Sequence, residues 1–330
     1  MSRPKMGVYM NSWKYFFWIF LASLALSGCG KNLLPTHPSA AASDPSPTTY
    51  PYKTSIATLD PEEVGVSSDA SYVFADLFAG TKVFVIGPFG MPATWSSFNS
   101  TPYNDIFGIS IAPNGSVYLL DGGNPYVYEY SLYGSPVTSW SGYGGGTFLE
   151  PCGIAVAPQN GNVYVADMGN QEVEEFSSQG APVTEWAFPN QPLFVAVSPV
   201  SPYDTYVVER NSHVIHEFSS TGNPVTQWGS EAVTSGVGGG TFAGIQGIAV
   251  SPQGNVFVTD GVGTCQSGSC TDHLVQEFSP HGTFLAQWGG SGTAAGDFGA
   301  NGGPGSLTFD GKGDLYVADP DGARVEVFGP

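Results

Sequence analysis

The chain repeats one short motif six times, and this repetition constrains the fold more than any other feature. Each copy opens with a run of small and branched apolar residues, such as CGIAVAP at 152–158 and QGIAVSP at 246–252. Gly65 and Gly108 are 43 residues apart, and Gly108 and Gly153 are 45 apart. Units of this period that contain four strand-like runs are typical of the blades of a β-propeller.

The other runs in each unit also have strand-forming composition, and Gly, Asn, Asp or Pro fills the turns between them. The sixth unit ends after its third run, at Pro330, whereas a spare strand-like run occupies residues 50–59. We therefore predict an all-β, six-bladed β-propeller of four-stranded antiparallel blades over residues 50–330, its last blade closed by an N-terminal strand. All five tryptophans after residue 28 end a fourth run, where a large aromatic side chain can pack between blades: Trp95, Trp140, Trp186, Trp228 and Trp288.

A family resemblance rests on these motifs. The series Gly-Ile-Ala-Val, Gly-Asn-x-Tyr-Val-Ala-Asp and Val-x-Glu-Phe resembles NHL-repeat propellers, and Asp272-His273-Leu274 stands where that family has Asn-His-Leu. The resemblance covers residues 64–330 and implies the fold, whereas activity depends on sites carried by the fold. Six-bladed relatives include metal-dependent lactonases, the streptogramin lyase and the peptide-amidating lyase, whose polar ligands converge on the central channel.

The first 28 residues differ from the rest of the chain. Three basic residues precede the apolar run YFFWIFLASLAL at 15–26, which is shorter than the ~20 residues of a transmembrane helix. The sequence Leu26-Ser27-Gly28-Cys29 resembles a bacterial lipoprotein signal, which implies cleavage before Cys29 and lipid attachment to its sulfur. An ordinary signal peptide and an uncleaved anchor are the alternatives. Residues 29–49, rich in Pro, Ser and Ala, are predicted to be a tether, which places the domain in the periplasm or outside the cell.

The charge of the chain limits its partners. Loss of residues 1–28 takes the net charge from −19 to −22 and leaves six Lys and Arg against 28 carboxylates. Binding to phosphate backbones needs clusters of Lys and Arg, so we exclude nucleic acid. Membrane contact is expected through the lipid anchor only.

The cysteines beyond Cys29 fall into two groups. Cys265 and Cys270 lie in one Gly/Ser-rich loop, where an exported setting favours a disulfide between them over a metal site. Cys152 precedes a strand-like run and is expected to be a small buried apolar residue, with a reactive thiol as the alternative.

A carboxylate ends the second run of every unit, so the fold would arrange six of them as a ring on one face. One interpretation is a rim that binds a divalent cation such as calcium. The other is architectural, because Asp before Gly or Asn accepts hydrogen bonds from the backbone of the following turn. Because the carboxylate recurs in every unit, we favour the architectural role and expect no cofactor. The residues are Asp76, Asp121, Asp167, Glu209, Asp260 and Asp319.

Loop length breaks the repeat. From Trp228 to Gly247 is 19 residues and from Trp288 to Gly305 is 17, against 13 from Trp95 to Gly108, and the loop after Asp260 is also long. In a four-stranded meander these connections emerge on one face, where propellers place recognition loops.

Tyr103, Tyr143 and His273 are the candidate contact residues of this face. The sequence thus favours a monomeric, non-catalytic scaffold that binds a protein, peptide or glycan there. The alternative is a metal-dependent enzyme of the lactonase or lyase type with its site at the central channel.

Overall fold

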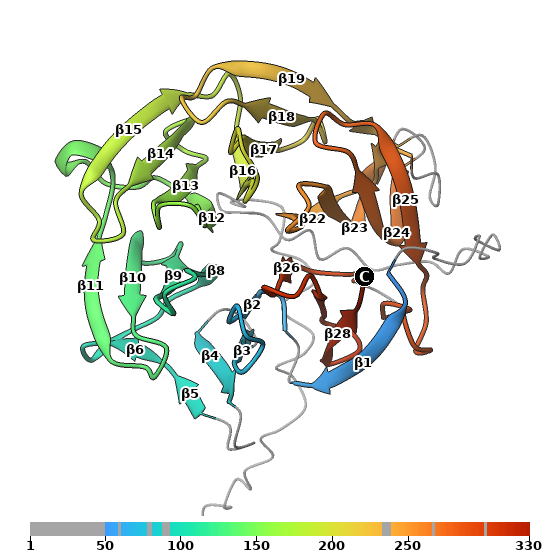
Figure 1. Ribbon diagram of the computed structural model, residues 1–330, viewed down its shortest axis with the longest axis horizontal. Helices are drawn as coiled ribbons and strands as arrows, with labels where there is room; N and C mark the ends of the chain where they lie inside the picture. Colours follow the sequence, from blue (N-terminus) through green and yellow to red (C-terminus); the bar gives the residue numbers. More distant parts are fainter. Residues whose placement is uncertain are drawn as a thin grey trace, which may run out of the picture.

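The protein is described by a computed structural model in which six four-stranded antiparallel sheets surround a central axis (Figure 1). The structure describes residues 50–58, 61–77, 81–87, 93–232, 239–265, 268–299 and 302–330. Only the backbone is described for Ala57, Leu77, 262–265 and 268–271. Within these ranges no helix has the length and apolar character needed to cross a membrane.

Each blade is an up-and-down meander that starts at the central axis. Blade 1 comprises β2 (Val64–Val66), β3 (Val73–Leu77), β4 (Lys82–Ile86) and β5 (Ala93–Trp95). Blade 2 comprises β8 (Ile106–Ile111), β9 (Val117–Asp121), β10 (Tyr126–Tyr130) and β11 (Pro136–Trp140). Blade 3 comprises β12 (Pro151–Val156), β13 (Val163–Asp167), β14 (Glu172–Phe176) and β15 (Pro182–Ala187).

The second half of the ring repeats this plan. Blade 4 comprises β16 (Pro192–Val197), β17 (Thr205–Glu209), β18 (Ile215–Phe218) and β19 (Pro224–Trp228). Blade 5 comprises β22 (Ile245–Val250), β23 (Val256–Cys265), β24 (Gly268–Phe278) and β25 (Phe284–Gly289). Blade 6 comprises β26 (Leu307–Phe309), β27 (Leu315–Asp319), β28 (Arg324–Phe328) and β1 (Tyr52–Ala57).

Short elements decorate the connections between blades. They are the pair β6 (Ser97–Phe98) and β7 (Thr101–Pro102), the parallel pair β20 (Ser230–Glu231) and β21 (Thr241–Phe242), and the 3-10 turn η1 (Tyr143–Gly145).

The N-terminal strand closes the ring, as the sequence predicts. β1 pairs antiparallel with β28, from Tyr52 opposite Phe328 to Ala57 opposite Arg324, and Figure 1 shows β1, in blue, beside β28, in red. Tyr50 is 5% exposed and stacks on Trp288 with a centroid separation of 5.8 Å. The seam is therefore held by backbone pairing and by aromatic burial together.

The tryptophans pack between neighbouring blades, which explains their recurrence. Trp140 of blade 2 lies under the β14–β15 turn of blade 3, where a Cβ added to Gly180 would come within 2.5 Å of the indole ring. Gly180 also has a φ of +78°, which side chains with a Cβ rarely adopt. The Gly at this turn is thus required both by backbone conformation and by the neighbouring indole.

Candidate functional site

The six ring carboxylates lie at one end of the propeller, where the second strand of each blade ends. The five aspartates are completely buried, at 0% exposure, and Glu209 is half-buried. Each accepts hydrogen bonds from the segment that leads into the first strand of its own blade. We call this end the loop-bearing face.

Backbone N–H groups of these entering segments are the recurrent donors. Asp76 Oδ1 accepts from the N–H groups of Glu62 and Glu63, both at 2.7 Å. Asp167 accepts from the N–H of Leu149 at 2.9 Å and from that of Asn170 at 3.3 Å. The sequence predicted the second kind of contact, to the following turn, but not the first.

A side-chain donor then ties most of these carboxylates to the same segment. In blade 3 the amide of Asn170 donates to Asp167 Oδ2 at 2.9 Å and to the carbonyl of Thr147 at 3.1 Å. Asn124 makes the equivalent pair of contacts in blade 2, to Asp121 and to the carbonyl of Pro102. In both blades the amide fixes the incoming loop to the end of the second strand.

In blade 5 the side-chain donor lies on the third strand, whereas Asn124 and Asn170 lie in the turn that follows the second strand. Gln276 on β24 donates to Asp260 Oδ2 at 3.1 Å and to the carbonyl of Thr241 at 3.0 Å. Burial raises the pKa of Asp260 well above its usual range, and the neighbouring Asp272 raises it further. Asp260 is therefore protonated over a wider range of pH than an ordinary aspartate.

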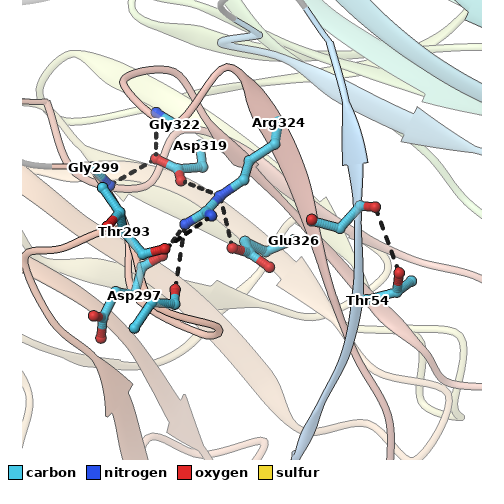
Figure 2. A network of polar contacts seen from close by, with 10 residues as sticks. Thr54, Thr293, Asp297, Gly299, Asp319, Gly322, Arg324 and Glu326 are labelled. Atoms are coloured by element: carbon cyan, nitrogen blue, oxygen red, sulfur yellow. Dashed lines mark hydrogen bonds and ion pairs between the residues drawn. The ribbon is translucent and has the colours of Figure 1, made fainter.

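Blade 6 uses an arginine, as Figure 2 shows. Arg324 Nε lies 2.9 Å from Asp319 Oδ2 and 2.8 Å from Glu326 Oε1, so one guanidinium faces two carboxylates. Its Nη2 donates to the carbonyl of Asp297 at 2.9 Å. Asp319 Oδ1 also accepts from the N–H of Gly299 at 2.8 Å.

In blade 4, Glu209 accepts from Asn190 and contacts His216 Nε2 at 2.9 Å. The ring carboxylates are thus engaged by the protein itself, which favours the architectural interpretation over a cation-binding rim. Among the residues that the structure describes, no group of three or more His, Cys, Asp or Glu is arranged to hold a metal ion.

Blade 3 contains an acidic group that sequence reasoning missed. Glu174 on β14 is 1% exposed, and its Oε2 has no hydrogen-bond partner. Burial raises the pKa of Glu174 to about 8, with further increases from the charges of Asp167 and Glu172, whereas the N–H of Tyr143 favours ionisation. Burial also raises the pKa of Asp167, to about 6. The available signal was a Glu in blade 3 and again in blade 6, Glu326, at a position where the other blades have Phe, Tyr, His or Gln.

Two of the three residues expected to contact a partner are not exposed. Tyr103 is 4% exposed because it packs on Tyr128 and its hydroxyl shares a hydrogen bond with Tyr130. His273 is 2% exposed, with a φ of +51°, and burial lowers its pKa. Both are interior residues, so the expectation that they contact a partner at the surface is wrong.

Tyr143, the third expected contact residue, is half-buried and packs on Phe176 at a centroid distance of 6.3 Å. It belongs to η1 on the loop-bearing face, so it alone of the three keeps some exposed surface there.

The long connections do share the loop-bearing face. Ile245, at the start of β22, pairs with Asp260 on β23, so the loop entering blade 5 and the extension of the β23–β24 hairpin emerge together. The ladder of that hairpin continues past Asp260 from Val262 opposite Thr271 to Cys265 opposite Gly268. In blade 6 the contacts of Arg324 place the loop around Asp297 at the same end.

The central channel differs in chemistry from the ring of carboxylates. The first strands of the blades enclose a cavity of about 190 Å³, lined mainly by apolar residues such as Ile109, Ile154 and Leu307. Among the described residues that line it, Glu63 is the only charged one, and none of the ring carboxylates is included. This lining does not supply the converging polar ligands that the alternative of a channel-centred metalloenzyme needs.

Cys152 is 1% exposed and is disulfide-bonded, so it is not the free buried thiol expected from the sequence. The side chains of Cys29, Cys265 and Cys270 lie outside those described, and their assignments stay predictions. Because the chain has four cysteines, lipidation of Cys29 and a Cys265–Cys270 bond cannot both accompany a disulfide from Cys152 to another cysteine of the same chain. Peptide mapping without reduction separates these cases.

Comparisons with known proteins support the fold. No family model and no curated protein matches the chain. A streptogramin B lyase structure aligns with a TM-score of 0.56 and 14% identity, over 84% of this chain and 96% of that one. Virginiamycin B lyase from Staphylococcus aureus gives 0.58 and 13%, over 86% and 100%. A protein of unknown function from Bacteroides thetaiotaomicron gives 0.61 and 16%, over 86% and 72%.

At these identities the likeness concerns the fold alone. The chain is a six-bladed β-propeller whose structural neighbours include proteins of the streptogramin B lyase type.

Proposed function

We propose that this protein is an exported, non-catalytic propeller that binds a protein or peptide through its loop-bearing face. The proposal rests on the contrast between the carboxylates that recur in every blade and the long loops that occur in only some blades. The ring carboxylates hold loops in place, whereas the departures from symmetry gather in the loops of blades 5 and 6 on one face. A rigid scaffold with variable loops at one end is a common design for recognition.

The rest of the proposal concerns location. The lipoprotein-like sequence at 26–29 and the Pro-rich segment 29–49 support attachment to a bacterial membrane through Cys29, with the propeller held away from the bilayer.

The net charge of the chain bears on the partner. With a charge of −19 before processing, long-range electrostatics would favour a basic partner over an acidic one.

The test is capture of partners from an extract of the producing cells by the immobilised domain. One variant replaces residues 263–270 with a two-residue turn, which shortens the β23–β24 hairpin in register because Val262 already pairs with Thr271. The matched control is Tyr133→Ser, since Tyr133 is 81% exposed on a turn of the opposite face. We expect the hairpin variant to lose partners that the control retains.

Protease treatment of the captured material separates a protein or peptide from a glycan, the other partner class expected from the sequence. Equal capture by the hairpin variant and the control would contradict the proposal. A tightly held divalent ion whose removal abolishes lactone or peptide cleavage would instead support the enzyme alternative.

A further inference from the structure

Blades 3 and 6 place opposite charges at one position of the same framework. In blade 6, Asp319 pairs across the ladder with Arg324 and Val317 with Glu326. In blade 3, Asp167 pairs with Glu172 and Val165 with Glu174. Glu174 therefore corresponds to Glu326, and Glu172 stands where blade 6 has its arginine.

The arginine contacts both carboxylates of blade 6. Burial raises the pKa of Glu326 to about 7, although the charge of the arginine lowers it. Arg324 Nε lies within 2.9 Å of both Asp319 and Glu326, whose side chains are fully buried. The side chain of Arg324 is itself 18% exposed, so this position reaches solvent at the loop-bearing face. A cation can thus occupy the position and still touch the surface.

Blade 3 has no arginine at this position, and there the amide of Asn170 makes the contact to Asp167 that Arg324 makes to Asp319, whereas Glu174 receives none of these contacts. Glu174 is 1% exposed with Oε2 unpartnered, and Glu172, two residues earlier on the same side of β14, is partly exposed. The charged groups that face Glu174 are Asp167 from β13, Glu172 from its own strand and Glu185 from β15, all acidic. An unpaired buried carboxylate is costly, and a matching cation relieves that cost.

The loop over this position has room at its tip. A Cβ added to Gly144 or Gly145 would meet no atom within 4 Å. At these two glycines the segment beside Glu174 presents bare backbone to an approaching group, whereas Tyr143 of the same turn packs on Phe176.

We propose that Glu172 and Glu174 receive the guanidinium group of an arginine side chain from the bound partner, beside the amide of Asn170, so that Glu174 gains the contact that Glu326 has from Arg324 in blade 6. The planar fork of a guanidinium donates to two carboxylates at once, which an ammonium or a spherical ion does less well. Among the described residues no cluster fits a metal ion, and the chain carries a net charge of −19 that attracts a basic peptide. The inference rests on the proposed binding function and names the chemistry of the partner.

Agmatine, a guanidinium on a short alkyl chain, is the probe. Its binding to the purified propeller is measured by titration calorimetry at pH 7 in two buffers of different ionisation enthalpy, with butylamine and calcium chloride as competing classes of cation. Because the pKa of Glu174 is raised to about 8, an ion pair there releases a proton. We expect saturable binding of agmatine with proton release, weaker binding of butylamine, and none of calcium at the same site.

Three variants locate the probe. Glu174→Gln should weaken agmatine binding by about tenfold or more and abolish proton release. Glu172→Arg, which supplies the cation within the chain, should block binding. Asp69→Asn, at an exposed turn of blade 1 on the opposite face, should change the affinity by less than about threefold.

Absence of agmatine binding, or equal binding by wild type and Glu174→Gln, would overturn the inference, as would stronger binding of calcium than of agmatine. None of these outcomes affects the partner-capture experiment with the shortened β23–β24 hairpin. Each proposal can therefore fail while the other stands.

Discussion

Blades 3 and 6 share backbone, register and loop anchoring, but they treat buried negative charge differently. Blade 6 pairs Asp319 and Glu326 with Arg324. Blade 3 places Glu174 beside Asp167 and Glu172 and accommodates it as a weak acid whose pKa is raised to about 8. The difference teaches that the repeat specifies where a buried polar group lies, whereas the neighbouring residues decide whether a cation accompanies it.

The largest effect is expected when blade 6 is made to resemble blade 3. Arg324→Met leaves two buried carboxylates without a counterion, which should cost about 3–5 kcal/mol of unfolding free energy. In a domain of this size that corresponds to a fall in Tm of roughly 10 °C, measured by thermal unfolding followed by circular dichroism. Lys82→Met removes the same charge from an exposed position and should change Tm by less than about 2 °C. Similar losses in both variants would contradict the assigned role of Arg324.

The reverse exchange should stabilise blade 3. Glu172→Arg places a cation beside Glu174 and Asp167, so we expect a gain of about 1–2 kcal/mol at pH 7, seen as a Tm higher by a few degrees. Glu172→Gln removes the same negative charge without supplying a cation and is the control. No gain from Glu172→Arg beyond that of the control would indicate that the two blades are not equivalent at this position.

A smaller effect concerns pH. The pKa of Glu174 is raised from 4.5 to about 8 in the folded protein, so between those values the unfolded chain releases a proton that the folded chain keeps. Stability attributable to Glu174 therefore falls as pH rises from about 4.5 to about 8 and levels off above that. Glu174→Gln lacks this dependence.

The difference in Tm between Glu174→Gln and wild type should accordingly grow in favour of the variant from pH 5 to pH 8. Comparing the two proteins at each pH cancels the contributions of Asp167 and Glu326, whose pKa values burial also raises, to about 6 and about 7. A difference that stays constant across this range would show that Glu174 is ionised throughout.

The fold was predictable because every level of the sequence agrees on it. Six repeats, the recurrent tryptophan and the spare run at 50–59 all indicate a ring closed by its own N-terminus, and β1 pairs with β28 accordingly. The surroundings of the candidate site were less predictable. The N–H groups that bind Asp167 come from a loop 18 residues upstream, at Leu149, and no sequence pattern marks that distance.

The expected contact residues failed for a related reason. The position of Tyr103 near a loop predicts an exposed side chain, but Tyr103 fills space against Tyr128. The unpaired Glu174 escaped notice because alternation along β14 does not distinguish a buried position between blades from one facing solvent. Only its comparison with Glu326, which has a cation beside it, shows what blade 3 lacks.

The most direct test of this account is the pKa of Glu174 itself. Carbon-13 NMR of the glutamate carboxyl groups, assigned by comparison with Glu174→Gln, follows its titration from pH 4 to pH 10 in wild type and in Glu172→Arg. We predict a midpoint near 8 in wild type and a clearly lower midpoint when arginine stands at position 172. A midpoint near 4.5 in both proteins would contradict the buried, uncompensated charge on which the comparison of blades 3 and 6 depends.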